Sequence, residues 1–544
     1  MSIRIFSNLR GDLFGGLTAA VVALPLALAF GVASGVGPIA GLYGAIAVGF
    51  FAAVLGGTPA QVSGPTGPMT VVMAAIVAQY ADNLTEAFAI VALGGSFQVI
   101  FGLMRVGRFV SYTPYSVVSG FMSGIGVIII VIQTLPFFGL ATAPGGPLGT
   151  MRIWPQIPAG LNWQALAIAM ASLATMIAWP KRLAAMVPPP LAAITIGTLM
   201  SVLLLPAAPV IGEVPTGLPS LVIPTFPLVD LPQVVQAALV LALLGSIDSL
   251  LTSLVADTIT RTRHNSDREL IGQGIGNMVS GLIGGLPGAG ATMRTLINVR
   301  AGGRTPLSGV VHALVLLALL LGLGPLVERV PHAALAGILI KVGWDIIDWS
   351  YLRRIRHAPR DKVVVMLVTL GLTVFVDLIT AVAVGLILAG FVTARWMERE
   401  ELKGITRISL ADGAADPSDP IERALLEQAD GRIEVIRLRG NFSYASARQL
   451  TQVLGGALEG PQAVIFDFSQ AAHVDTSAAY AIDELITEAQ EGGIRCYISG
   501  LSDATKPTLV GLGVLGKLET GDLCRDRKTA LQQALATLPA TTGA

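Results

Sequence analysis

Charged residues are scarce in this sequence. Only 13% of its 544 residues are Asp, Glu, Lys or Arg, whereas soluble domains average about 25%. The two signs are equal in number, so the formal net charge is zero, and a protein that binds nucleic acid through a basic surface is excluded. The shortage of charge is confined to residues 1–397. We therefore expect a transmembrane domain at 1–397 and a cytoplasmic domain at 398–544.

Cysteine and histidine are also scarce. The two cysteines, Cys496 and Cys524, both lie in the expected cytoplasmic domain. Two cysteines exclude a disulfide framework and suit a reducing cytosol. No nucleophile and base form a recognisable catalytic arrangement, so we expect neither an enzyme nor an organic cofactor. The five histidines are expected at membrane interfaces or on surfaces, namely His264, His312, His332, His357 and His473.

Long apolar runs fill most of the chain. A helix needs about 20 apolar residues to cross the hydrocarbon core of a bilayer, and the sequence has fourteen candidate segments, some of them short or interrupted by Gly and Pro. They are 13–33, 38–56, 67–81, 86–104, 114–138, 163–180, 188–206, 233–257, 269–285, 291–301, 306–325, 332–348, 362–377 and 378–396.

The basic residues predict how these segments are oriented. Lys or Arg follows the fourth, sixth, eighth, twelfth and last segments, whereas 139–162 has only Arg152 and 207–232 has no basic residue. Cytoplasmic loops are the ones enriched in Lys and Arg, so both termini are expected in the cytoplasm. We expect a multi-pass protein of the bacterial inner membrane, in contact with lipid.

Two segments interrupt the apolar pattern in the same way. Residues 63–70 (SGPTGPMT) and 284–293 (GGLPGAGATM) are rich in Gly and Pro, and each leads into a short apolar run. Unwound backbone at membrane depth is tolerated where it lines a protein cavity. A matched pair of such breaks, one in each half, indicates the binding site of an inverted-repeat transporter. The alternative is a pair of ordinary kinks or loops.

These breaks predict an anion site. Each one starts a half-helix whose first amides have no intrahelical partner and together hold about half a positive charge. Two such ends facing each other would bind an anion without a fixed cation. Thr66, Thr70 and Thr292 add hydroxyl donors. A small anion is therefore favoured over a cation or a sugar.

Asp248 lies inside a long apolar segment, where a carboxylate is costly unless it pairs or binds a proton. Thr252 is four residues later and so shares its helical face. A carboxylate, a hydroxyl and the carbonyls of an unwound segment are hard oxygen ligands, so we expect a Na⁺ site at Asp248. The alternatives are a structural carboxylate paired with Arg294 and a proton-binding carboxylate.

Two further residues have open roles. Arg294, two residues after Thr292, either raises the positive potential at the anion site, or extends toward the cytoplasm or pairs with Asp248. Phe30, five residues after the helix-breaking Pro25, either walls the cavity or packs as an ordinary core aromatic.

Several motifs resemble the sulfate permease (SulP) family of anion transporters, which includes animal solute carrier 26. The resemblance extends over nearly the whole chain, and its clearest motifs are 41–46, 114–121, 265–277, 290–298 and 303–305. It implies seven plus seven membrane segments in an inverted repeat with core and gate domains. It also implies a homodimer that works by an elevator-like motion.

Within the family, the chain most resembles the cyanobacterial sodium-dependent bicarbonate transporters, through residues 10–16, 64–72, 260–266, 288–293 and 342–349. This resemblance implies that Na⁺ binds Asp248, Thr252, Gly290, Ala291 and Thr292. It implies that bicarbonate binds beside it, at Thr66, Gly67, Ala291 and Thr292, with Phe30 and Arg294 as further candidates. In two departures, Arg294 replaces a small residue and Leu26 a polar glutamine.

The expected cytoplasmic domain has strand patterns at 433–440, 463–469 and 494–499, with helices starting near 475 and 504. This alternation predicts a small α/β sandwich. It resembles the STAS domain, named for sulfate transporters and anti-sigma-factor antagonists, which implies a regulatory, dimerising or partner-docking role. Thr476 and Ser477 loosely match a phosphorylation motif, but an ordinary helix cap explains them as well.

Three functions remain open from the sequence. The first is Na⁺-coupled bicarbonate symport, in which the cation neutralises the loaded site. The second is proton-coupled transport or exchange of sulfate, chloride or a dicarboxylate. The third is an anion channel or a non-transporting sensor that signals through the STAS domain.

Overall fold

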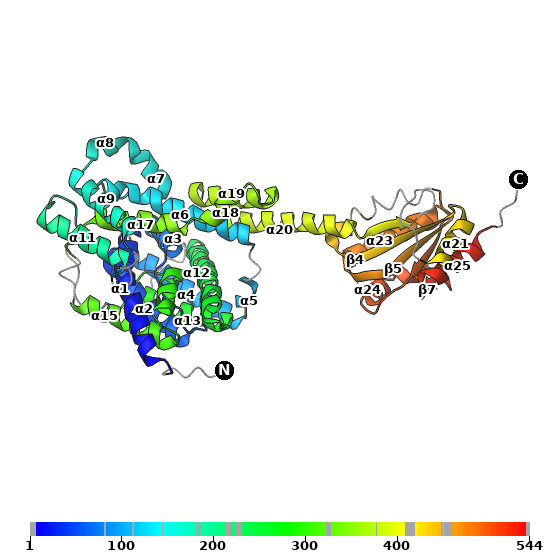
Figure 1. Cartoon of the computed structure of the whole chain (residues 1–544), viewed down its shortest axis with the longest axis horizontal. Helices are drawn as coiled ribbons and strands as arrows, with labels where there is room; N and C mark the ends of the chain where they lie inside the picture. Colours follow the sequence, from blue (N-terminus) through cyan, green and yellow to red (C-terminus); the bar gives the residue numbers. More distant parts are fainter. Residues whose placement is uncertain are drawn as a thin grey trace. The chain divides into compact units, whose positions relative to one another are not determined.

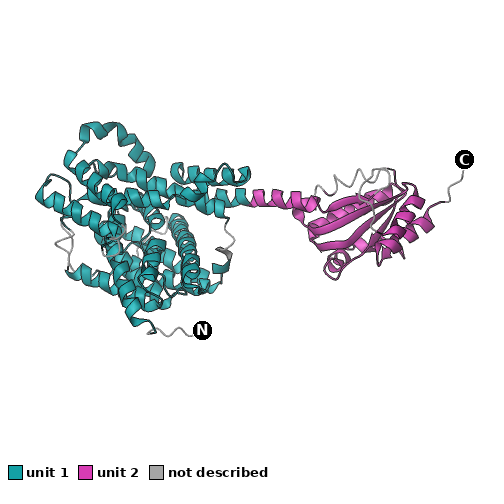
Figure 2. Ribbon diagram, in the orientation of Figure 1, with its two compact units in different colours: residues 1–389 teal, residues 390–544 magenta. Residues whose placement is uncertain are grey.

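The chain has two compact units in the computed structural model, Met1–Ala389 and Gly390–Ala544 (Figure 2). The structure describes residues 7–80, 83–110, 114–143, 145–180, 183, 187–212, 219–223, 231–322, 328–376, 378–408, 419–447, 450 and 460–539. The boundary expected at 397 and this division both lie inside helix α20 (Leu378–Leu402).

Each apolar segment predicted from the sequence forms a helix (Figure 1). In chain order these helices are α1 (Leu9–Ala33), α2 (Pro38–Leu55), α3 (Gly67–Gln79), α4 (Leu84–Leu103), α6 (Tyr115–Phe137), α9 (Trp163–Ala178), α11 (Pro189–Leu203), α12 (Leu231–Thr260), α13 (Ser266–Leu282), α14 (Thr292–Arg300), α15 (Pro306–Gly322), α17 (His332–Ile346), α19 (Arg360–Phe375) and α20. Short helices lie between them, namely α5 (Gly107–Val110), α7 (Gly146–Ile153), α8 (Ile157–Gly160) and α18 (Trp349–Arg353).

The helices differ widely in length. Among the described residues, six helices are long and apolar enough to cross a membrane by length and composition, and a pair bent by 117°, Gly146–Gly160 with Trp163–Ala178, would make a seventh. The shortest predicted segments, α3 and α14, have 13 and 9 residues. At about 1.5 Å per residue, neither can cross a hydrocarbon core of about 30 Å alone. Both begin at the unwound breaks, as expected of half-helices.

The packing of the first unit is reciprocal between its halves. Helix α1 packs against α14 and α15, while α12 packs against α3 and α4. Helices α2 and α13 pack against each other. When α1–α11 and α12–α20 are taken as two sets of seven, each of these contacts has its counterpart in the other set, as expected of an inverted repeat.

The helices form a core and a gate. The core contains α1 to α4 and α12 to α15, which pack closely with one another. In the gate, α6 packs against α17 and α19, and α9 packs against α11 and α17. The core meets the gate where α1 contacts α11 and α17 and where α3 contacts α6.

The second unit is an α/β sandwich. Its five-stranded sheet has the order β3 (Ile405–Ile408), β4 (Ile433–Phe442), β5 (Ala463–Val474), β6 (Arg495–Ser499) and β7 (Leu523–Cys524). The β3–β4 pair is antiparallel and the other pairs are parallel. Helix α23 (Thr476–Glu491) covers one face, and α21 (Pro420–Ala429) and α25 (Arg527–Thr537) cover the other. The three predicted strands are confirmed.

Local chemistry starts the main helix of this unit where the sequence placed it. Asp475 is the N-cap of α23, and its side chain accepts a hydrogen bond from the Ala478 amide. Thr476 and Ser477 are exposed in the first turn. The predicted helix near 504 is α24 (Lys506–Gly511). The sequence patterns missed β3, β7, α21 and α25, which have only 2 to 11 residues each and so offer few repeats to detect.

Candidate functional site

The two breaks meet at the centre of the core. Strand β1 (Ser63–Gly64) pairs antiparallel with β2 (Ala289–Gly290), and the Ala291 amide donates to the Val62 carbonyl. The unwound backbones thus satisfy each other's hydrogen bonds, which the absence of water at this depth demands. The pairing places the starts of α3 and α14 side by side.

Glycine is required where these backbones cross. A Cβ atom at Gly288 would lie 2.5 Å from the Gly64 carbonyl carbon, and Gly64 itself has a φ of +146°. Asn277 of α13 holds the same segment through both polar atoms of its side-chain amide. Its Oδ1 accepts from the Gly288 amide at 2.7 Å and its Nδ2 donates to the Gly288 carbonyl at 2.9 Å.

Helix α12 joins the two half-helices through polar side chains one turn apart. Asp248 is 8% exposed, and its Oδ2 accepts a hydrogen bond of 2.8 Å from Thr66 Oγ1. Thr252 Oγ1 donates to the Gly290 carbonyl at 2.9 Å and lies 2.8 Å from Thr292 Oγ1. The structure therefore brings together the residues that the sequence placed in the two sites.

The oxygen atoms at this point suit a small hard cation. A carboxylate of Asp248, hydroxyls of Thr252 and Thr292 and the carbonyl of Gly290 surround the junction of α12, β2 and α14. Oxygen ligands of this kind are preferred by hard cations. No cluster of three or more His, Cys, Asp or Glu side chains lies in the described part of the chain. A transition-metal centre is thus not supported there, whereas a site with one carboxylate fits a monovalent ion.

A buried polar network that the sequence analysis missed supports β2. Ser249 Oγ accepts from the Gly290 amide at 3.1 Å. Ser253 Oγ donates to Gln61 Oε1 at 3.0 Å, and Gln61 Nε2 donates to Glu269 Oε1 at 2.9 Å. The Glu269 carboxylate is buried, pairs with no cation among the residues that the structure describes, and accepts hydrogen bonds from neutral donors, including the amides of residues 57 and 58. The sequence signal that could have revealed this network is the presence of polar residues inside apolar segments.

Arg294 points into the core. It is 3% exposed, donates through Nη2 to the Pro65 carbonyl, and is close enough to Asp248 for the two charges to attract each other. Of the roles left open, extension toward the cytoplasm is wrong, because the guanidinium is enclosed between the two half-helices. The site thus contains one fixed positive and one fixed negative charge.

The hydroxyl groups expected as anion donors already have partners. Thr66 donates to Asp248, Thr70 donates to the Thr66 carbonyl at 2.8 Å, and Thr292 is paired with Thr252. The Ala291 amide is occupied by Val62. The remaining donors are the first amides of α3 and α14 and the Arg294 guanidinium. An anion that uses Thr66 must compete with Asp248 for its hydroxyl.

One expectation about the histidines is wrong. His312 was expected at an interface or surface, but in α15 it is fully buried and lies near Arg294. Helix α15 packs between α1 and α2, so a residue near its first third is enclosed by protein rather than exposed at the bilayer surface. The apolar sequence around His312 gave no indication of which face is covered.

Small cavities lie on two sides of the site, between core and gate. Phe30 is buried and lines one of them together with Thr70 of α3 and Gln133 of α6. Asp248 lines the other, facing Phe121 of α6 and Val382 of α20. Each has a volume of about 20 Å³, enough for one water molecule.

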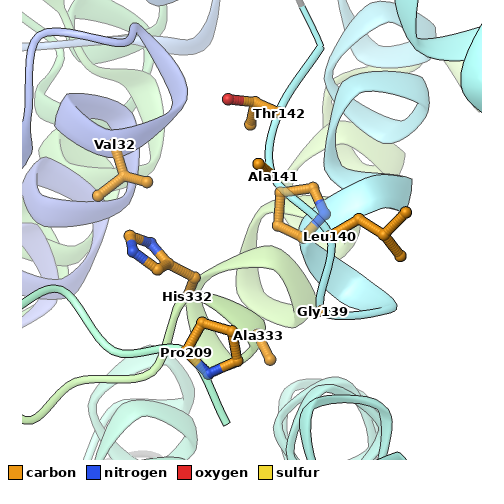
Figure 3. A pocket seen from close by; sticks show the side chains of 9 residues that line it. Val32, Gly139, Leu140, Ala141, Thr142, Pro209, His332 and Ala333 are labelled. Atoms are coloured by element: carbon orange, nitrogen blue, oxygen red, sulfur yellow. The ribbon is translucent and has the colours of Figure 1, made fainter. Parts of the chain in front are cut away.

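A larger cavity, here called the vestibule, lies farther along the same helices. Its volume is about 460 Å³. Figure 3 shows Val32 of α1 facing His332 at the start of α17, with Pro209 and residues 139–142 completing the wall. These residues belong to helix ends and loops that the basic-residue pattern assigns to the side opposite the cytoplasm.

The chain is similar to known transporters over nearly its whole length. It is 42% identical over 541 residues to the bicarbonate transporter BicA of Picosynechococcus sp., covering 97% of this chain and 95% of that protein. It is 44% identical over 540 residues to the bicarbonate transporter BicA of Synechocystis sp., covering 98% and 95%. It is 31% identical over 526 residues to the putative sulfate transporter YvdB of Bacillus subtilis, covering 93% and 94%.

Solved structures agree with the fold. The transmembrane domain of a cyanobacterial bicarbonate transporter BicA has 49% identity and a TM-score of 0.67, covering 69% of this chain and 98% of that one. Murine Solute Carrier 26 family member A9, an anion transporter in the inward-facing state, has 19% identity and a TM-score of 0.81, covering 99% and 93%. This second likeness concerns the fold alone.

Family models divide the chain in the same way. The model of the sulfate permease family matches residues 9–369, and the model of the STAS domain matches residues 426–530. Members of the first family are transporters rather than enzymes. The chain therefore belongs to the sulfate permease family, and it is a membrane anion transporter with a C-terminal STAS domain.

Proposed function

We propose that this protein is a Na⁺-coupled bicarbonate symporter that moves its core past its gate in an elevator-like cycle. The observation that supports it best is the convergence of Asp248, Thr252, Gly290 and Thr292 beside the starts of two half-helices. Two relatives named as bicarbonate transporters are more than 40% identical to the chain. Na⁺ would occupy the oxygen cluster, and bicarbonate would bind near Thr66, Gly67 and the first amides of α14.

The hydrogen bond between Thr66 and Asp248 provides a mechanism for coupling. Without Na⁺, Thr66 donates its proton to the Asp248 carboxylate. A cation at Asp248 competes for that carboxylate and frees the Thr66 hydroxyl for the anion. It also offsets the repulsion between Asp248 and the anion. Two like charges in adjacent sites repel by several kcal/mol at an effective dielectric constant of about 20. Anion binding is therefore favoured once Na⁺ is present.

The test is uptake of labelled bicarbonate by proteoliposomes with and without an inward Na⁺ gradient. We expect Na⁺ to stimulate uptake by the wild type and Asp248→Asn to abolish the stimulation, because a neutral amide neither attracts Na⁺ nor repels the anion. Asp257→Asn is the matched control. Asp257 is on the same helix but pairs with His264 at 2.7 Å, away from the half-helices. Bicarbonate uptake that is equal with and without Na⁺ would rule out the coupling.

One observation favours a second candidate, which is exchange or proton-coupled transport of sulfate, chloride or a dicarboxylate. Arg294 supplies a resident positive charge at the site, so an anion has an attractive partner without Na⁺. Uptake of sulfate, chloride and fumarate in the same vesicles separates the two. Transport of these anions in preference to bicarbonate, without Na⁺, would support the second candidate.

The cellular setting is part of the proposal. We place the protein in the bacterial inner membrane as a homodimer, with both termini in the cytoplasm. The STAS domain would dock a regulatory partner or the second copy.

A further inference from the structure

A single amide side chain from the gate faces the candidate site. Gln133 lies on α6 and lines the small cavity whose core side contains Phe30 and Thr70. Apart from Gln133 and Thr70, the residues around this cavity are apolar, with Ile129, Ile132 and Leu339 as the neighbours from the gate. A polar group in such surroundings is costly unless something binds it.

Gln133 has no such partner in the described part of the chain. It is 4% exposed, and no described residue hydrogen-bonds its side-chain amide. Its polar side-chain atoms are not among the fully enclosed unpaired atoms of the described residues, so they reach the cavity that they line. The cavity of about 20 Å³ admits one water molecule, which can satisfy the amide in this conformation. The amide is therefore available to a polar molecule that enters from either side.

Gln133 lies between residues that line the vestibule and residues of the half-helix α3. Pro136, one turn along α6, lines the vestibule, and Thr70, on the opposite wall of the small cavity, is one turn from Thr66. The vestibule and the small cavity share the end of α1, through Val32 and Ala33. An anion that passes from the vestibule to Thr66 meets Gln133 before it reaches the core site.

We propose that Gln133 is a selectivity ligand on the gate, which recognises the protonated oxygen of a small oxyanion such as bicarbonate. This proposal deepens the proposed function and rests on it. Bicarbonate has a hydroxyl that donates and carboxylate oxygens that accept. A glutamine amide offers one acceptor and two donors, so it pairs with both groups at once. Thr70 donates its own proton to the Thr66 carbonyl, so its lone pairs also accept.

The contact forms when core and gate separate. In this structure a Cβ atom at Gly67 would lie 2.9 Å from Ile129 Cδ1 and 2.8 Å from Ile346 Cδ1, so core and gate fit closely here. A space of about 20 Å³ holds water but no bicarbonate. Gln133 therefore acts on the anion during entry or exit, while Asp248 and the half-helices hold it in the core.

Formate provides the comparison that isolates this interaction, because it keeps the carboxylate of bicarbonate but lacks the hydroxyl. We would measure kcat/KM for labelled bicarbonate and labelled formate by counterflow in proteoliposomes that contain the full-length protein. Gln133→Leu removes both the donors and the acceptor at nearly constant volume, and we expect it to lower the bicarbonate-to-formate ratio about tenfold or more. Gln133→Asn, which keeps the amide, should give a bicarbonate-to-formate ratio between those of Gln133→Leu and wild type.

Ile132→Leu in the same cavity is the control and should leave the ratio within about twofold of wild type. The proposal is overturned if Gln133→Leu changes the bicarbonate-to-formate ratio less than twofold. It is also overturned if Gln133→Leu and Gln133→Asn each lower kcat/KM equally for bicarbonate and formate, as the loss of a purely structural role would. Failure of the proposed function would show in the wild type instead, as bicarbonate counterflow that is absent or unaffected by Na⁺.

Discussion

The carboxylate of Asp467 lies at the centre of the STAS sheet and is fully buried. Arg527 donates to it from Nη1 at 3.1 Å and to Glu422 from Nη2, and Ser499 Oγ donates to it at 3.3 Å. A buried charge without its partner is more costly than the pair is stabilising. Arg527 therefore matters chiefly because its loss would leave the Asp467 carboxylate without its ion-pair partner.

Arg527→Met should destabilise the STAS domain by about 3–5 kcal/mol, because it removes the ion-pair partner of a buried carboxylate. Denaturant unfolding of the purified full-length protein, followed by a fluorophore in the STAS domain, measures the change. Arg525→Met removes an exposed charge two residues away and should shift stability by less than about 0.5 kcal/mol. Equal stability of the two variants would contradict this account.

At the scale of elements, helices α1 and α2 approach so closely that only glycine fits between them. A Cβ atom at Gly41 would lie 1.9 Å from the Ala27 carbonyl oxygen, which is backbone and cannot turn aside. Helix α1 presents Phe30 to the cavity beside Thr70. The separation of these two helices therefore sets one wall of the route to the site.

Gly41→Ala should force α1 and α2 apart, with a loss of several degrees in melting temperature and a lower yield of monodisperse protein in detergent. Overpacking of this kind typically costs about 1–3 kcal/mol. Gly371→Ala in α19 is the matched control, because no atom lies within 4 Å of the added Cβ and alanine favours a helix. Gly371→Ala should melt at or above the wild-type temperature. A Gly41→Ala protein that melts like wild type would show that the helices can shift freely.

At the scale of the whole molecule, both native thiols are buried, so introduced cysteines can be labelled selectively. Burial raises the pKa of Cys496 to about 12 and also raises the pKa of Cys524. The thiolate is the reactive form, so burial, which encloses both thiols and raises their pKa, slows their reaction with maleimide. Maleimide labelling therefore reports on introduced cysteines.

The predicted topology then gives opposite results at two exposed positions. Ala141→Cys, beside the vestibule, should react with a membrane-impermeant maleimide in intact cells. Thr262→Cys, after α12 in a basic loop, should react only after the membrane is permeabilised. Labelling of Thr262→Cys in intact cells would invert the orientation and place the vestibule on the cytoplasmic side.

The sequence by itself determined the segments, the breaks and the local chemistry. Apolar runs located all the long helices, the Gly- and Pro-rich breaks located both half-helices, and the four-residue spacing of Asp248 and Thr252 put them on one face. Asp475 marked the start of α23. These features depend on neighbours within a few residues, so composition and spacing were sufficient to predict them.

Only the tertiary structure decided which groups meet across the repeats. The bond between Thr66 and Asp248 joins residues 182 positions apart, and the inward direction of Arg294, the burial of His312 and the position of Gln133 beside Thr70 are equally non-local. A membrane helix that is apolar on all sides has no periodicity to show which face meets which neighbour. Those faces are set by the packing of the two halves against each other.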